Sequence, residues 1–443
     1  MDMFCNSDNM APSSFGETVI HKNRKAWPAL VNRHEMGTHR PDPSFYGIHT
    51  TLLHPAFGMF MDDIDMTRVS ELTRDDFAFT LEFCREMSAV YPSEDLRQDK
   101  ALRLLRVYLE EDIHPRRPNP SNQSSSDGSI VACVTAPVVV LNLEIKNEIG
   151  HGGAEPIFEG LGYYLNFFRQ EQWCFGKCVV PALLVTSVGA HLSVSFVAHA
   201  EQVVMDPATP LLPLLFLPHD RAMMESVARC LWAVKRCVKH LKQFYSELQH
   251  STATDSIERF SFPYLNSVVV DGVADPVHID YLSQVGKKLV FRALLELPTG
   301  AVEIIVKFTK QYCEAAHRVC YEFERGAPYL YHIGHLPGHW IAVVMEDIQE
   351  TRLFCKDSDW PILSRLVNKL HEHNIVHGDL RLGNILISAD RVCLIDFDWS
   401  GVVDEQKYPS FMNHADIIWP PGASDGLCLS KEHDLHFLEL FRL

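Results

Sequence analysis

The sequence predicts two domains, an α/β domain followed by an α+β domain. Its 443 residues are 47% hydrophobic and 22% charged, which is enough apolar chain for two cores. Strand-like and helix-like patterns alternate in the first half, and short apolar strands surround a polar loop in the second. The polar run 251–256 separates the halves. We expect a loosely ordered or packing arm over 1–65, the α/β domain over 66–250 and the second domain over 260–443.

Charge and cysteine usage limit the class of protein. The 57 acidic residues outnumber the 40 basic ones, and the net charge of −17 argues against a protein that coats nucleic acid. The 12 cysteines lack the paired spacing of zinc sites and are expected to be free thiols, which favours a reducing compartment. No apolar run is long enough for a signal peptide or a membrane span. We therefore expect an intracellular protein, of cytoplasm or nucleus, without a membrane partner.

Two helices are expected to begin the α/β domain. Thr73 and Asp76 form a capping box for the first, and Ser93 can cap the second. The apolar face expected for the first helix consists of Phe77, Leu81, Phe83, Cys84 and Met87. The apolar residues of the second are Leu96, Leu102, Leu105 and Leu109. Residues 115–128, rich in Pro, Ser and Asn, are expected to be a loop.

The rest of this half alternates between strands and helices. The expected elements are strands over 130–134 and 138–145, a helix over 155–169, and a hairpin of strands over 182–188 and 192–198 joined through Gly189. A long helix over 222–249 carries apolar residues spaced alternately by four and three. Its basic residues off that stripe favour a solvated face over a DNA-contacting or dimerising one. They are Arg229, Lys235, Arg236, Lys239 and Lys242.

The strongest chemical signal is a polar loop near the C-terminus. The sequence His-Gly-Asp over 377–379 is followed by Asn384, an apolar run and then Asp396. Phosphoryl transfer needs an acid near the attacking hydroxyl and oxygen ligands for Mg²⁺. Asp379 suits the first role, and Asn384 and Asp396 suit the second. The alternative is that this segment is an ordinary polar turn.

This loop resembles that of the protein-kinase-like superfamily, and its His-Gly-Asp form is closest to small-molecule, lipopolysaccharide and atypical kinases. The resemblance implies that Asp379 is the catalytic base, that Arg381 contacts phosphate, and that Asn384 and Asp396 bind Mg²⁺. Asp398 replaces the glycine of the usual Asp-Phe-Gly. The implied cofactors are ATP and Mg²⁺. The implied acceptor is a hydroxyl of a protein Ser/Thr or of a small molecule.

Further residues follow from the same resemblance. Lys307 ends an apolar strand and resembles the lysine that holds the α- and β-phosphates. Its acidic partner is expected to be Glu314, in preference to Glu322. The nucleotide loop is degenerate, with Gly286 as its glycine. The hinge near adenine is expected at Met345, Glu346 and Asp347.

The end of the chain supports a second interpretation of this domain. The chain ends soon after Asp396, which leaves little room for an activation segment and substrate-binding helices. A catalytically inactive pseudokinase that binds nucleotide as a scaffold, or a truncated gene product, is the alternative. A helix is expected to start around 433–438.

An acid and a lysine close the second strand of the α/β domain. Glu144 and Lys146 are two apart, so in a strand both point to one face, where the acid can bind a metal and the lysine can act on water. Asp127, before the preceding strand, is the candidate additional acid. A solvated strand end is the alternative interpretation.

With the second half, this pattern resembles fungal proteins related to the Crinkler group, in which a restriction-endonuclease-like domain precedes a kinase-like one. The resemblance rests on Glu144, Lys146, Asn147, Glu148, the turn Gly152-Gly153, Pro156 and Tyr163. Glu159 stands where the family pattern would place Gln. The resemblance implies a metal-dependent nuclease core, a nucleic-acid partner and a source among filamentous basidiomycetes.

Overall fold

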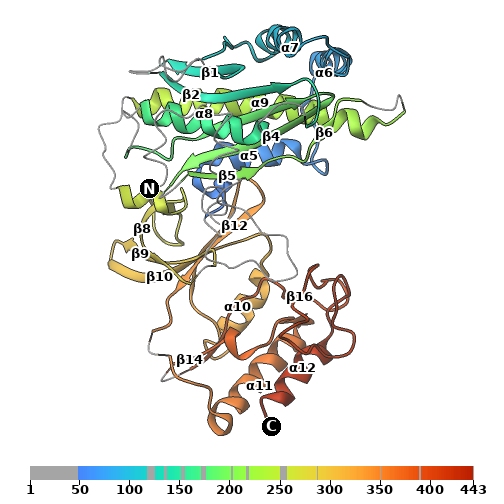
Figure 1. Ribbon diagram of the computed structural model, residues 1–443. Helices are drawn as coiled ribbons and strands as arrows, with labels where there is room; N and C mark the ends of the chain where they lie inside the picture. Colours follow the sequence, from blue (N-terminus) through green and yellow to red (C-terminus); the bar gives the residue numbers. More distant parts are fainter. Residues whose placement is uncertain are drawn as a thin grey trace. The chain divides into compact units, whose positions relative to one another are not determined.

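The computed structural model describes eleven stretches of the chain (Figure 1). They are residues 48–116, 125–133, 137–150, 155–170, 176–200, 203–215, 219–249, 257–286, 288–349, 351–388 and 391–442. The chain divides into two compact units, Met1–Tyr264 and Leu265–Leu443. In the described stretches, no helix combines the length and the apolar character needed to cross a membrane.

The first unit is built on a six-stranded mixed sheet. Its order is β1-β2-β3-β4-β5, with β6 paired to β4, and only β2 and β3 run parallel among the described pairs. The strands are β1 (Gly128–Cys133), β2 (Pro137–Lys146), β3 (Ala182–Val188), β4 (His191–His199), β5 (Val203–Pro207) and β6 (Leu212–Pro213). The parallel pair requires a crossover, which α8 provides. The expected strands and the hairpin through Gly189 are thus confirmed.

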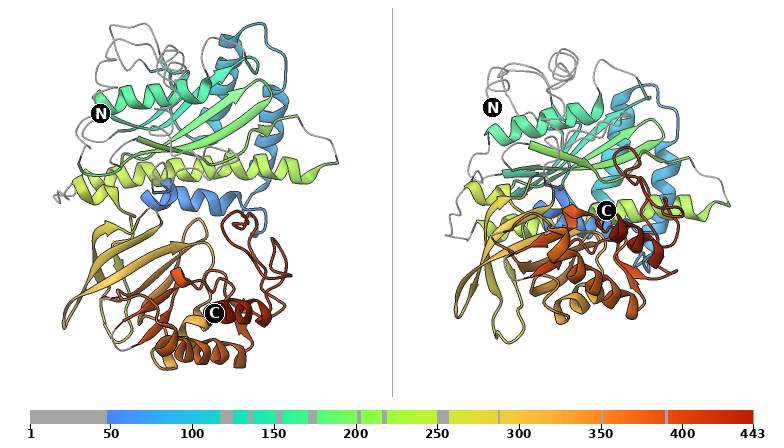
Figure 2. Two further views of the ribbon diagram at one scale, coloured as in Figure 1. Left: turned by 60° about the horizontal axis from the view of Figure 1, so that its bottom comes forward. Right: turned by 90° about the horizontal axis from the view of Figure 1, so that it is seen from below.

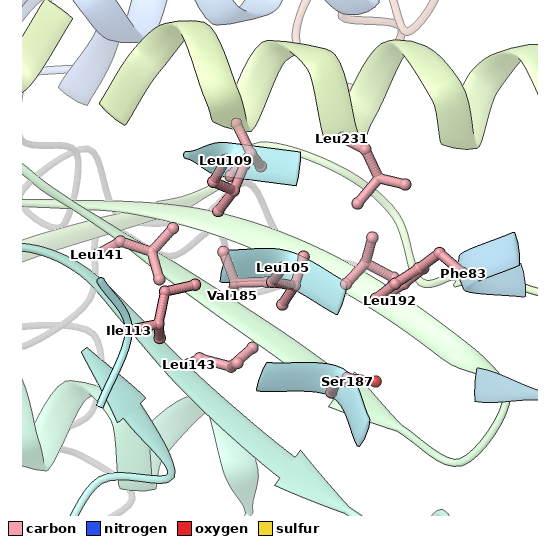
Figure 3. Close-up of a pocket in the computed structure, with 12 residues that line it drawn as sticks. Phe83, Leu105, Leu109, Ile113, Leu141, Leu143, Val185, Ser187, Leu192 and Leu231 are labelled. Carbon is pink, nitrogen blue, oxygen red and sulfur yellow. The ribbon is translucent and has the colours of Figure 1, made fainter. Parts of the chain in front are cut away.

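Helices cover both faces of this sheet (Figure 2). The elements are α4 (Thr50–Leu53), α5 (Pro55–Ile64), α6 (Arg74–Met87), α7 (Glu94–Leu109), α8 (Pro156–Gln170), α9 (Arg221–Leu248) and the short η4 (Ile257–Ser261). On one face, Leu161 and Tyr164 of α8 pack against Leu184. On the other, Leu105 of α7 and Leu231 of α9 lie over the sheet (Figure 3). The cavity left there is about 10 Å³, so the second face is a packed core without room for a ligand.

Two helix faces differ from the sequence expectation. The capping box of Thr73 and Asp76 is confirmed, but Phe77 and Leu81 are 42% and 53% exposed. Helical rotation places them beside the buried stripe that contains Phe83 and Met87 rather than on it. The side chain of Ser93 caps α7 as expected. The expectation that Leu96 lies on the apolar face of α7 is also wrong, because that residue is 51% exposed.

Two further expectations concern the surroundings of α9, and the one for Arg229 needs correction. Within the expected arm, Thr50–Leu53 and Pro55–Ile64 are helical, and α5 contacts α9 with Phe57 and Phe60 fully buried. Residues 1–47 lie outside the described stretches. Arg229 was expected on a solvated face but is 4% exposed. Its guanidinium donates to carbonyls at the end of α5 and just beyond, at 2.8 and 2.9 Å, and these acceptors stabilise the buried charge.

The second unit contains a six-stranded antiparallel sheet followed by a helical part. The sheet order is β11-β12-β10-β9-β8-β7. Its strands are β7 (Ser267–Val268), β8 (Val277–Gln284), β9 (Val290–Leu297), β10 (Gly300–Thr309), β11 (Leu330–Leu336) and β12 (Trp340–Glu346). The expected strands around Lys307 and before the hinge are confirmed as β10 and β12.

The helical part positions the polar loop. It contains α10 (Glu314–Glu322), α11 (Lys356–Glu372), η5 (Leu382–Asn384) and α12 (Lys431–Leu440), with β13 (Ile375–Val376) paired to β16 (Gly401–Val402) and β14 (Ile385–Ile387) paired to β15 (Val392–Leu394). Side chains of these elements share one core, including Leu366, Leu380, Phe397 and Leu438. Because Leu380 and Phe397 are fully buried, the residues next to them in the chain are held in place. The helix expected around 433–438 is α12.

Candidate active site

Asp379 lies at the centre of the loop that precedes η5. The residue is 5% exposed. Its carboxylate accepts two hydrogen bonds from the Arg381 guanidinium, from Nε to Oδ1 and from Nη2 to Oδ2, both at 2.6 Å. The Asn384 amide donates to the Asp379 backbone carbonyl at 2.8 Å and to its Oδ2 at 2.9 Å. Three residues that the sequence singled out are therefore in direct contact. This leaves an acid oriented by two donors at the end of a buried loop.

A residue of α12 also fixes the backbone of the same loop. Asp434 is 1% exposed, and its carboxylate accepts from the backbone N–H of His377 at 2.8 Å and of Gly378 at 3.0 Å. Gly378 has φ +82, and a Cβ there would meet the Trp399 carbonyl at 3.2 Å and Leu429 at 3.1 Å. Glycine is thus required at the turn into Asp379.

Lys307 contacts two acids that follow β15, about 90 residues later in the chain. It is 9% exposed, and its ammonium pairs with Asp396 Oδ1 and, at 2.6 Å, with Asp398 Oδ1. Asp396 follows β15 with φ +69, a conformation that few residues other than glycine adopt. Such backbone strain occurs at functional sites, where the surrounding structure holds it in place.

Charge at this cluster is unevenly shared. Burial alone would lower the pKa of Lys307, but the two carboxylates outweigh it and the pKa is raised. Burial is the largest single influence and opposes the ionised form of Asp396, but the charge and hydrogen bond of Lys307, with the charges of Lys288 and His377, together outweigh it and the pKa is lowered. The pKa of Asp398 is raised by burial and by the neighbouring Asp396 charge. One ammonium faces two carboxylates, so the cluster attracts a further cation.

The expectation that Glu314 pairs with Lys307 is wrong. Glu314 is on the first turn of α10 and its carboxylate binds Arg318 at 2.6 Å, four residues on in the same helix. The buried residues of α10 are Ala316, His317 and Cys320, so the polar position that faces inward is His317. Its ring bonds the Tyr312 hydroxyl at 2.5 Å and the Pro328 carbonyl at 2.7 Å. In so short a helix, the spacing of polar and apolar residues does not distinguish the inward face from the outward face.

The remaining expected nucleotide-binding residues lie on the sheet. Met345 and Glu346 end β12, and Glu346 pairs with Arg391 and accepts from the Tyr329 N–H at 3.0 Å. Asp347 pairs with Arg292 at 3.1 Å. Gly286 lies in the turn between β8 and β9 with φ +61 and open space around it. That turn is the place where a loop over nucleotide phosphates was expected.

Sequence reasoning missed three residues of this site. Lys288, in the β8–β9 turn, adds a positive charge that helps to lower the pKa of Asp396. Thr309 donates to Asp398 at 3.0 Å, and Asp434 anchors the loop. The signals were present: a lysine two residues after Gly286, a hydroxyl two residues after Lys307 on one strand face, and an acid inside an apolar helix.

A second polar cluster lies at the C-terminal end of β2, inside the sheet of the first unit. Asp127 accepts from the backbone N–H of Ile145 at 2.7 Å. The Lys146 ammonium lies 3.1 Å from Glu159 of α8 and 3.4 Å from Glu94 of α7. Glu144 is 2% exposed, and its Oε1 has no hydrogen-bond partner among the residues that the structure describes. The structure therefore brings the expected acids and lysine together and adds Glu94 and Glu159 to them.

The acids of this cluster are strongly perturbed. Burial raises the pKa of Asp127 to about 6, against the favourable bond from Ile145. Burial, with the charges of Asp127 and Glu159, raises the pKa of Glu144 well above its usual value. Across the described residues, no group of three or more His, Cys, Asp or Glu side chains is arranged to hold a metal ion. The turn Gly152-Gly153 lies outside the described residues.

Comparisons with known proteins show which proteins parts of this chain are similar to. Residues 341–408 match the lipopolysaccharide kinase (Kdo/WaaP) family. The chain is 25% identical over 118 residues to the EKC/KEOPS complex subunit BUD32 of Debaryomyces hansenii, covering 24% of this chain. It spans 45% of that relative's length. Residues 341–408, which belong to the second unit, are therefore similar to a kinase-like family.

Two solved structures overlap parts of the chain. The Cydia pomonella granulovirus kinase PK-1 has a TM-score of 0.25 and 18% identity, covering 29% of this chain and 57% of that one. Vaccinia related kinase 3 has a TM-score of 0.31 and 11% identity, covering 41% and 68%.

Proposed function

We propose that the second unit is an ATP-dependent phosphotransferase that moves the γ-phosphate to a hydroxyl of a protein Ser/Thr or of a small molecule. Asp379 orients and deprotonates the hydroxyl, and Arg381 and Lys307 hold phosphate oxygens. The observation that carries the proposal is the convergence of Lys307 on Asp396, 89 residues away in the sequence. A buried lysine paired with a partly buried aspartate, in the same unit as an oriented second acid, supports charge stabilisation at a phosphate.

Two cofactors are implied by these residues. Asn384 and Asp396 carry the amide and carboxylate oxygens that Mg²⁺ prefers, and they would hold it. When bound, Mg²⁺ neutralises charge on the phosphoryl oxygens. The backbone of the hinge at Met345, Glu346 and Asp347 would face adenine, and the turn at Gly286 would lie over the phosphates.

Label transfer tests this proposal. With γ-labelled ATP and Mg²⁺, wild-type protein should label itself or a generic protein acceptor, and Asp379→Ala should abolish the transfer. Asp404→Ala, which changes an acid on a turn of the same unit, should leave it unchanged. If wild type binds ATP without transferring label, the unit is a nucleotide-binding pseudokinase. If it does not bind ATP, the kinase-like function is wrong.

We propose a second function, metal-dependent nucleic-acid cleavage, for the polar cluster of the first unit. The buried Oε1 of Glu144, which has no hydrogen-bond partner among the described residues, favours it, because a buried carboxylate without a donor is costly unless it is protonated or a cation binds it. Asp127 and Glu144 would hold the ion, and Lys146 would stabilise or deprotonate the attacking water.

Cleavage and metal binding test this second function separately. Wild type should nick supercoiled DNA in Mg²⁺ or Mn²⁺, and Lys146→Ala should not. Mn²⁺ should raise the melting temperature of wild type but not of Glu144→Gln. Intact DNA with both proteins, together with equal melting shifts, would exclude a nuclease site here.

A further inference from the structure

Lys307 pairs with Asp398, which follows β15, and not with an acid of α10. We propose that Asp398 is a positioning residue that fixes Lys307 for the ATP phosphates, in the role that the sequence assigned to Glu314 of α10. The inference rests on the proposed phosphotransferase function and adds to it the residue that orients its lysine.

The helix α10 offers Lys307 no acid. The Glu314 side chain is 41% exposed and is engaged by Arg318, and Glu322 is exposed. The buried position is taken by His317, whose ring stacks on Phe397 with a centroid distance of 5.1 Å. Both ring nitrogens of His317 are already bonded, so this side of α10 is closed by a neutral network.

Asp398 has the geometry of a fixed partner. Its Oδ2 accepts from the Thr309 hydroxyl at 3.0 Å, and its Oδ1 lies 2.6 Å from the Lys307 ammonium. Thr309 and Lys307 are two apart on β10 and share a face of the strand. The carboxylate therefore contacts one strand with both oxygens, by a hydrogen bond from Thr309 and an ion pair with Lys307, and this holds the lysine relative to its own backbone.

Asp396 alone cannot balance the charge of Lys307 and fix its position once a metal is bound. A carboxylate that ligates a divalent ion shares its charge with that ion, and Lys307 is 9% exposed, so its ammonium needs another counter-charge. Asp398 supplies it. The lysine then stays in position whatever α10 does, and Asp396 is left to the metal.

The test separates nucleotide binding from catalysis. We would measure KM for ATP and kcat for Asp398→Asn, Thr309→Val and the control Glu314→Gln. Asp398→Asn should raise KM about tenfold, because the buried Lys307 ammonium loses the charge of one of its two carboxylate partners. Thr309→Val should raise it about threefold because the pair persists without its anchor. Glu314→Gln should stay within about twofold of wild type.

Three outcomes would overturn the inference. Glu314→Gln could raise KM as much as Asp398→Asn, or Asp398→Asn could bind ATP as well as or better than wild type. Alternatively, raising Mg²⁺ could restore Asp398→Asn, which would make Asp398 a metal ligand instead. Melting temperatures show whether each variant folds. If Asp398→Asn does not fold, Thr309→Val tests the inference in its place.

The failure of the proposed function would look different. If wild type binds ATP but transfers no label, the same variants are compared by titration with ATP, and the expected ratios apply to Kd. If wild type binds no ATP, the phosphotransferase proposal fails, and the inference fails with it.

Discussion

At the scale of single residues, the Asp379 carboxylate is already oriented before any substrate arrives. Arg381 binds both of its oxygens in a fork, and Asn384 adds a third bond. A guanidinium is the group that fits this geometry, because it presents parallel N–H donors where an ammonium is a point charge. The pattern implies that Arg381 is needed for shape as well as for charge.

Arg381→Lys should therefore lower kcat for phosphate transfer about tenfold while the charge is kept. The matched control is Arg365→Lys, which changes a surface arginine that binds Glu324 at 2.8 Å and should leave kcat unchanged. Label transfer at saturating ATP measures both variants. Equal rates for Arg381→Lys and wild type would show that the fork is not needed.

A second residue-scale prediction concerns acid stability. Burial lowers the pKa of His317 to about 4 from 6.5, against the Pro328 carbonyl, which favours the charged ring. Between these values the unfolded chain binds more protons than the folded one, so the free energy of unfolding falls as pH falls. From about pH 7.5 to about pH 5.5 His317 should contribute a loss of roughly 1 kcal/mol.

Urea unfolding at the two pH values measures this loss. His317→Gln keeps a polar side chain that does not titrate, so its loss of stability should be smaller than that of wild type. His335→Gln removes an exposed imidazole and should show the wild-type loss. If His317→Gln and wild type lose the same free energy, His317 is not the group responsible.

At the scale of elements, local patterns were predictable and the choice of partners was not. The cap at Thr73, the β3–β4 hairpin and the loop at Asp379 follow from residues close in sequence, and each was expected. The partner of Lys307 depends on which face of α10 meets the core, and the sequence of α10 does not specify it. Phe77 was misplaced for the same reason, since a helix with apolar residues on two stripes buries only one.

The contact of α12 with the loop is the element-scale feature most open to test. Asp434 accepts two backbone N–H groups, whereas an asparagine would turn an NH₂ group toward one of them. Asp434→Asn should cost about 2 kcal/mol of unfolding free energy and should lower phosphate transfer. Glu432→Gln, on the solvent side of the same helix, should do neither. Unchanged stability of Asp434→Asn would mean that α12 does not hold the loop.

At the scale of the whole molecule, each candidate site is built within one unit. Asp379, Lys307 and Asp396 all belong to Leu265–Leu443, and Glu144 and Lys146 belong to Met1–Tyr264. No described contact of either cluster requires a residue of the other unit. The two proposed chemistries should consequently be separable by substitution.

Separability is tested in the full chain with one variant in each unit. Lys146→Ala should abolish DNA nicking and leave phosphate transfer within about twofold of wild type, and Asp379→Ala should do the reverse. The double variant should show the two losses together with no further effect on either rate, because sites without shared partners act additively. If Lys146→Ala also abolishes phosphate transfer while its melting temperature is unchanged, the two sites are coupled, and the first unit then controls the kinase-like one.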